Sequence, residues 1–135
     1  MVYLKPLWTT QKVFNPIAMR FGLSGVETLS VRKRRSGELE QVPVIPVEHE
    51  GSRYIVSPRG ETDWVRNLRA AGGRGQLGRG DSVELFQATE VPVEERAGII
   101  EIYRKKAGRT VESFWKTLPN PADHPTFRLQ MIGAS

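Results

Sequence analysis

Apolar and polar residues alternate along three stretches of the chain, within 28–31, 82–88 and 126–131, and a period of two is typical of a half-buried β-strand. Residues 53–57 form a fourth stretch that is predicted as a strand. A fifth stretch, 41–47, is rich in β-branched residues but holds two prolines, which predict a strand with an unpaired or bulged edge because proline has no N–H to donate. We expect the three segments between 28 and 57 to form an antiparallel meander with short connections.

Apolar residues recur at helical spacing in two segments between the later strands. A helix is predicted to begin at Thr62 or Asp63, whose side-chain oxygens can cap free backbone N–H groups, and to end at the glycine Gly72. Another is predicted from Pro92 to Gly108, because proline suits a first helical turn and glycine suits the position after the last one. A shorter helical piece covers 111–116, whereas the glycine-rich segment 74–80 is expected to be a hairpin region.

The N-terminal part of the chain has a different pattern from the rest. Its apolar positions between residues 13 and 21 predict a short amphipathic helix that docks on the core, with a lid over a pocket or contact with a membrane surface as the alternatives. No stretch approaches the roughly 18 apolar residues that a membrane span requires. Strands and helices that do not alternate regularly indicate an α+β, mainly β, fold with an antiparallel sheet or small barrel and packed helices.

The composition of the chain limits the kinds of partner and site that the protein can have. Lys and Arg number 20 against 15 Asp and Glu, and the resulting net charge of +5 predicts an anionic partner: nucleic acid, a membrane surface or a small polyanionic ligand. The chain has no cysteine, which excludes disulfides and a cysteine nucleophile. His49 and His124 are its two histidines, which argues against a multi-histidine zinc centre; without an evident partner, both are expected to be surface or capping residues.

Residues 73–78 formally match the G-x-G-x-x-G dinucleotide fingerprint. That fingerprint works after a strand and at the start of a helix, where the helix N-terminus meets the pyrophosphate. Here it follows a predicted helix and precedes a predicted strand. We therefore interpret this segment as a loop.

A basic turn between two predicted strands carries the main functional signal. Residues 32–37 combine four cations with a serine and a glycine. Arginine side chains match phosphate oxygens, a serine hydroxyl can donate to them, and glycine allows backbone N–H groups to approach. On this motif alone, a phosphate cradle, a solvated basic turn and a nucleic-acid patch are equal alternatives.

A second segment, residues 54–68, decides between these three interpretations of the basic turn. It predicts a strand, a tight glycine turn and a helix that carries Trp64 and Asn67 three residues apart on one face. The Arg35-Ser36-Gly37 turn together with this segment resembles the deazaflavin (F420)-dependent nitroreductase family, over about residues 27–129. The resemblance implies a split β-barrel related to the FMN-binding barrels, with residues 1–26 as a helical segment that caps the pocket and residues 27–135 as the deazaflavin-binding domain.

The resemblance further implies coenzyme F420 as the cofactor and assigns site residues. Those expected to bind it are Arg34, Arg35, Ser36 and Gly37 at the phosphate, Pro43 and Val44 against the ring, Ser57, Pro58, Arg59 and Gly60 beside its reactive edge, and Trp64 and Asn67 closing the site. Candidate catalytic residues are Ser57 and Tyr103, and candidate substrate-pocket residues are Trp8, Phe114 and Trp115. The family commonly has a basic residue three positions after the motif glycine, where this chain has Glu40.

The activity implied is hydride transfer from reduced F420 to an electron-poor acceptor: a quinone, an activated alkene or a nitro compound. The expected partner is a small-molecule acceptor and not a nucleic acid. The protein is expected to be a cytoplasmic monomer, with peripheral membrane contact left open. The alternatives are a non-catalytic carrier of F420 or flavin and a basic nucleic-acid-binding module.

Overall fold

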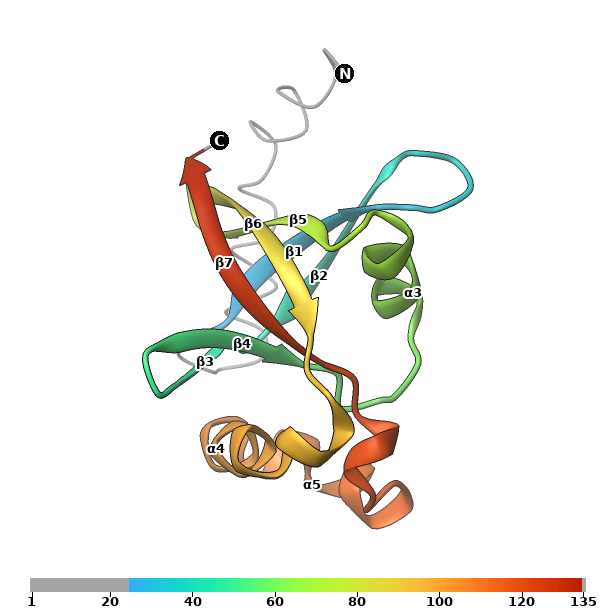
Figure 1. The fold of residues 1–135 in the computed structure, drawn as a ribbon, viewed down its shortest axis with the longest axis vertical. Helices are drawn as coiled ribbons and strands as arrows, with labels where there is room; N and C mark the ends of the chain where they lie inside the picture. Colours follow the sequence, from blue (N-terminus) through green and yellow to red (C-terminus); the bar gives the residue numbers. More distant parts are fainter. Residues whose placement is uncertain (1–24, 135) are drawn as a thin grey trace.

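A computed structural model describes residues 25–134, and Figure 1 shows a strongly curled sheet with helices packed beside it and beneath it. Within these residues the strands are β1 (Glu27–Arg32), β2 (Leu39–Val44), β3 (Val47–His49), β4 (Ser52–Val56), β5 (Arg74–Arg79), β6 (Ser82–Glu90) and β7 (Thr126–Ala134). The helices are α3 (Asp63–Ala70), α4 (Ala97–Ala107) and α5 (Arg109–Thr117), with single 3₁₀ turns at η2 (Val93–Glu95) and η3 (Pro121–Asp123). The predicted N-terminal helix and Trp8 lie outside the described residues. No helix of residues 25–134 is long and apolar enough to cross a membrane.

The sheet is closed on itself by a short link between its two edges. Its strand order is β2-β1-β5-β6-β7-β4-β3, with every neighbouring pair antiparallel, so β2 and β3 are the two edge strands. Only Ile45 and Pro46 separate these strands in the sequence. Because three Cα–Cα steps span at most about 11 Å, the sheet has to curl until its opposite edges meet at this link. The result is the predicted α+β, mainly β, barrel that stays open along one seam.

The predicted three-strand meander is wrong at its second segment, residues 41–47, which is divided between two strands, β2 and β3. β1 pairs with β2 and β3 pairs with β4, but β2 and β3 do not pair with each other. Pro43 and Pro46 lack the N–H groups that a ladder between these strands needs, and the chain passes from one edge of the sheet to the other instead of folding back. The unpaired edge that the prolines predict is confirmed.

Helix α3 begins and ends where the sequence predicts it. Thr62 is its N-cap residue, but no side chain caps the helix, so the expected capping hydrogen bond is absent here. At the other end, the Gly73 N–H donates to Leu68 O with a φ of +85°, a conformation that glycine adopts without strain. A Cβ at Gly73 would also collide with the Ala88 carbonyl, so this glycine allows the segment between α3 and β5 to lie directly against β6.

Two other segments differ from expectation. The glycine-rich segment is a regular strand, β5, which forms six pairs with β6, so the interpretation of residues 73–78 as a loop is wrong. It still does not begin a helix and lacks the geometry of a dinucleotide site. The helix expected from Pro92 starts as the 3₁₀ turn η2, and α4 begins only at Ala97.

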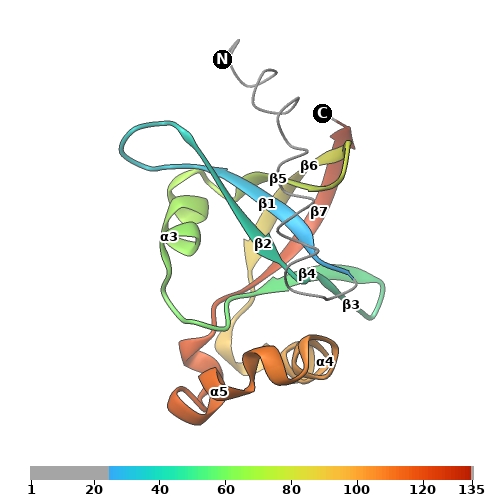
Figure 2. The same ribbon diagram turned by 180° about the vertical axis from the view of Figure 1, so that it is seen from behind.

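Apolar side chains gather in two clusters, one inside the barrel and one beneath it. The first lies between the curled sheet and α3 and includes Leu29, Leu68 and Phe86, each fully buried. The second includes Val47, Ile100 and Trp115 and joins β3 and β4 to α4 and α5. Figure 2 shows the resulting arrangement, with α3 beside the sheet and the α4–α5 pair below β3 and β4.

Two glycines provide a matched test of this packing. A Cβ at Gly75 would lie 2.7 Å from Phe86 Cζ and 3.2 Å from Ser30 O, so Gly75→Ala should lower the free energy of unfolding by about 1–3 kcal/mol. A Cβ at Gly98, within α4, would meet only ordinary contacts at 3.6 Å or more, and Gly98→Ala should raise that free energy by about 0.5–1 kcal/mol. Urea unfolding of both variants measures whether the free energy of unfolding falls or rises. Equal changes in the two variants would contradict the packing described for β5 against β6.

Candidate functional site

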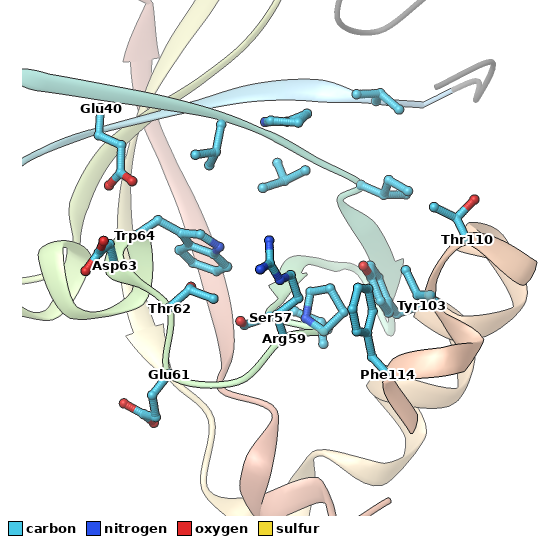
Figure 3. A pocket seen from close by; sticks show the side chains of 18 residues that line it. Glu40, Ser57, Arg59, Glu61, Thr62, Asp63, Trp64, Tyr103, Thr110 and Phe114 are labelled. Carbon is cyan, nitrogen blue, oxygen red and sulfur yellow. The ribbon is translucent and has the colours of Figure 1, made fainter. Parts of the chain in front are cut away.

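A cavity of about 740 Å³ opens along the seam of the barrel. Small-molecule sites commonly occupy about 300–1,000 Å³. Figure 3 shows its walls: β2 on one side, the first turn of α3 at one end, the β4–α3 loop along the bottom, and α4 and α5 at the other end. The space therefore lies where segments distant in the sequence converge.

The edge strand β2 supplies a flat apolar wall. Val42, Pro43, Val44 and the following Ile45 line the cavity, and of these Pro43 is exposed. An edge strand has no further strand on its open side, and a proline there leaves no N–H to attract one. Pro43 and Val44, which the resemblance places against a cofactor ring, thus lie at the cavity.

The loop after β4 is held by hydrogen bonds that centre on Gly60. The Ser57 hydroxyl donates to Gly60 O at 2.6 Å, and the Thr62 N–H donates to the same oxygen at 2.9 Å. Gly60 has a φ of +90°, which favours glycine. Ser57, Pro58 and Arg59 line the cavity, and the Arg59 side chain extends into it (Figure 3), whereas Gly60 does not line it.

His124 supports this loop from behind. It is fully buried, so the expectation of a surface or capping histidine is wrong for this residue. Its ring nitrogens lie 3.0 Å from Ser57 O and 2.6 Å from Leu118 O, and its ring stacks on Trp115 with centroids 3.9 Å apart. The imidazole thus ties the end of β4 to the end of α5.

The first turn of α3 presents polar groups to the cavity. Trp64 is 8% exposed and lines the cavity, and Figure 3 shows its indole nitrogen on the side that faces Arg59. Thr62 also lines the cavity, and its hydroxyl oxygen is buried without a hydrogen-bond partner within the described residues. A buried hydroxyl without a partner is costly, so this position favours a ligand with a polar edge.

Helices α4 and α5 form the wall opposite α3. Tyr103, Val111 and Phe114 line it, and the Tyr103 hydroxyl points toward the cavity in Figure 3. Burial raises the pKa of Tyr103 above its ordinary value, so the phenol is neutral. Trp115, the other candidate substrate-pocket residue, lies instead between His124 and Tyr103, away from this cavity.

More acidic than basic side chains line the cavity. Arg59 is the one cation among the described residues that line it, whereas Glu40, Glu61 and Asp63 also line it. Glu61 points away in Figure 3 and bonds with Arg69, a hydrogen bond that lowers the pKa of Glu61. Glu40 and Asp63 give the end near α3 its negative charge.

The basic loop, residues 33–37, lies outside the cavity lining, between β1 and β2. Arg34 is directed toward α3, where its backbone N–H and its Nη1 both donate to Asn67 Oδ1, at 3.0 and 2.7 Å. Lys33 and Arg35 are exposed, and within residues 25–134 their side chains have no hydrogen-bond or ion-pair partner. Asn67 is buried and does not line the cavity.

The structure thus brings half of the expected site residues together at the cavity and adds residues that the sequence did not indicate. The sequence predicts Thr62 and Asp63 only as helix-capping residues and Val111 only as part of a short helix, and it assigns no role to Thr110, yet all four line the cavity. The sequence does contain a signal for Thr110 and Val111. They precede Phe114 by four and three residues and therefore share its helical face. Nothing in the sequence indicated that the partly buried Glu40 would face Asn67.

A family model and several solved structures match this chain. The model of the F420H(2)-dependent quinone reductase family matches residues 7–116. An F420-H2 dependent reductase, FDR-A, shares 21% sequence identity with a TM-score of 0.58, covering 79% of this chain and 95% of that one. No curated protein matches.

Two further solved structures share the fold. A FAD-binding protein from Mesorhizobium loti is 15% identical with a TM-score of 0.54, over 87% of this chain and 88% of its own. A protein described as a domain-swapped dimer is 20% identical with a TM-score of 0.58, over 80% and 81% of the two chains. These likenesses confirm the split β-barrel. Since the family model spans most of the sequence, the chain belongs to the F420H2-dependent quinone reductase family, and it is an F420H2-dependent oxidoreductase with coenzyme F420 as its cofactor.

Proposed function

We propose that this protein transfers a hydride from reduced F420 to a quinone bound in the cavity along the barrel seam. The observation that carries the proposal is the cavity itself, which has an apolar wall on β2, an aromatic wall on α4 and α5, and a basic loop on the same edge of the barrel. A flat conjugated molecule with an anionic tail matches this combination. Activated alkenes and nitro compounds are the other acceptor classes to be tested.

The residues around the cavity fit the cofactor. A polycyclic ring needs flat apolar contacts, which Pro43 and Val44 offer, and polar partners at its edge, which the unpaired Thr62 hydroxyl and the Arg59 side chain offer. Arg35 and Ser36 are proposed to bind the phosphate. Reduced F420, when bound, would supply a hydride and release one proton to solvent, and with one proton taken up from water one quinone becomes one hydroquinone and F420 is left oxidised.

The charge at the cavity favours an uncharged acceptor. Glu40 at one end disfavours an anionic acceptor, whereas the charge of Asp63 is partly offset by Arg34, and the apolar side chains of β2 and α5 favour a molecule that gains by leaving water. A neutral quinone meets both conditions. An acceptor that carries a carboxylate or sulfonate meets neither.

The two candidate catalytic residues differ in what they can do. The Ser57 hydroxyl already donates to Gly60 O, so its remaining capacity is to accept a hydrogen bond. The Tyr103 phenol keeps its proton and is aimed at the cavity. We therefore propose Tyr103 as a hydrogen-bond donor to the oxygen on which negative charge develops, and water as the source of the transferred proton.

The assembly state of the protein is a separate question. We propose a monomer. The domain-swapped dimer among its structural neighbours represents the other outcome. Light scattering coupled to gel filtration distinguishes them.

The cofactor assignment predicts the behaviour of an Arg35→Ala variant. The wild type should bind F420 and should oxidise reduced F420 when menadione is added, followed by the loss of F420H2 and the gain of F420 absorbance. Arg35→Ala should weaken F420 binding by about 10- to 100-fold, because one charge-assisted hydrogen bond is lost. Arg35 is a cleaner choice than Ser36, whose Oγ accepts from the Glu38 N–H and shapes the loop.

Lys105→Ala is the matched control, because it removes one exposed cation from α4. It should bind F420 as the wild type does. Equal binding by the Arg35 and Lys105 variants would contradict the phosphate assignment. Tight binding without oxidation by menadione, an enone or a nitro compound would show a carrier instead of an enzyme.

The state of Tyr103 predicts a pH dependence of stability. A phenol whose pKa is raised by folding holds its proton more tightly in the folded state, so its contribution to stability is complete below a pH of about 10 and is lost as the pH rises above it. The free energy of unfolding of the wild type should fall more steeply above this pH than that of Tyr103→Phe. Urea unfolding at a series of pH values measures the difference, and parallel curves would contradict the burial of the phenol.

A further inference from the structure

The Asn67 side chain connects three parts of the chain that lie far apart in the sequence. It is 3% exposed, on the face of α3 that lies under the basic loop, residues 33–37. Its Oδ1 accepts from the Arg34 N–H at 3.0 Å and from Arg34 Nη1 at 2.7 Å, and its Nδ2 donates to Glu40 Oε1 at 2.7 Å. We call this arrangement of Arg34, Asn67 and Glu40 the clasp.

We propose that Asn67 is a positioning residue that presents the basic loop to the cofactor, and that Glu40 fixes the orientation of the Asn67 amide. The inference rests on the proposed function for its ligand. It assigns to Asn67 and Arg34 a role different from direct contact with the cofactor. It also assigns a defined role to Glu40, which would hold the Asn67 amide by accepting from Nδ2.

The chemistry of the three groups permits one orientation of the amide. The Glu40 carboxylate can only accept hydrogen bonds, so it must face Nδ2. The Arg34 backbone N–H and guanidinium can only donate, so they must face Oδ1. Loss of the carboxylate would leave a partly buried N–H without its partner and would remove the group that prevents the amide from turning.

The clasp uses groups that would otherwise be available to a ligand. Asn67 does not line the cavity, and its oxygen already accepts two hydrogen bonds. The Arg34 guanidinium also approaches Asp63 Oδ1 at 3.5 Å, so it is directed toward α3 at both of its terminal nitrogens. The side chains of Lys33 and Arg35 remain as the cations of the loop that a phosphate or a carboxylate tail can reach.

The basic loop is braced internally, so holding it at Arg34 positions all of it. The Lys33 N–H donates to Glu38 O at 2.7 Å, and the Gly37 N–H donates to Lys33 O at 2.9 Å. Arg32 Nη1 donates to Gly37 O at 2.7 Å, at a glycine whose φ is +77°. A loop that is ordered before binding avoids the entropy cost of ordering with the ligand, which strengthens binding.

Limited trypsin digestion of the protein without cofactor tests the clasp directly, because Lys33, Arg34 and Arg35 are trypsin sites within the loop. Asn67→Ala should be cut there about tenfold faster than the wild type, since cleavage follows the population of the open loop. Glu40→Ala, a change at a half-buried position, should act in the same direction. Glu40→Gln keeps an acceptor oxygen for Nδ2 and should stay near the wild-type rate.

Glu38→Gln is the matched control, because Glu38 carries the same charge two residues before Glu40 and its side chain has no hydrogen-bond partner within the described residues. It should leave the cleavage rate unchanged. Cleavage of Asn67→Ala at the wild-type rate would overturn the proposal. So would equal acceleration by Glu38→Gln and Glu40→Ala, since that result would depend on charge alone.

Titration with F420, followed by fluorescence, tests the consequence for the ligand. Asn67→Ala and Glu40→Ala should raise the Kd for F420 about tenfold and the KM for F420 similarly, with the KM for menadione unchanged. The Arg34→Ala, Asn67→Ala double variant should bind no more weakly than Asn67→Ala, because both changes break one clasp. Additive losses, or tighter binding by Glu40→Ala, would overturn the proposal, whereas failure of the wild type to bind F420 would overturn the proposed function.

Discussion

The two-residue link between β2 and β3 is the constraint on which the rest of this structure depends. It joins strands at opposite edges of the sheet, so the sheet must curl until these edges meet. Pro43 and Pro46 prevent the edges from pairing there, because neither can donate a ladder hydrogen bond. The barrel is therefore closed in space but open in its hydrogen bonding, and the cavity occupies that seam.

The seam is kept open by side chains that brace its borders from behind. His124 joins Ser57 O to Leu118 O, and the buried Arg96 donates to the carbonyls of Val91, Pro121 and His124. Arg96 thus satisfies carbonyls after β6 and around η3, and a ring N–H of His124 donates to a carbonyl at the end of β4 or α5, where regular secondary structure stops. The buried side chains of His124 and Arg96 thus hold the walls of the cavity in place. The surfaces that face a ligand are largely apolar.

The positive charge of the chain is divided between structural and accessible groups. Arg34, Arg69 and Arg96 have carboxylate or carbonyl partners that hold parts of the fold together. Lys33 and Arg35 are exposed beside the seam, and Arg59 extends into the cavity. We propose that an anionic cofactor binds these three cations; the net charge of +5 indicates the sign of a partner but not where it binds.

The sequence by itself determined the helix α3 with its terminal glycines, most strands, the proline-bearing edge and the pairing of two motifs that identifies the family. These are local properties, fixed by periodicity, φ preferences and missing N–H groups. Only the tertiary structure decided that β2 and β3 form opposite edges, that His124 is buried against Trp115, and that Asn67 holds Arg34 and Glu40. These depend on contacts between residues that are distant in the sequence, which strand order brings together and no local pattern encodes.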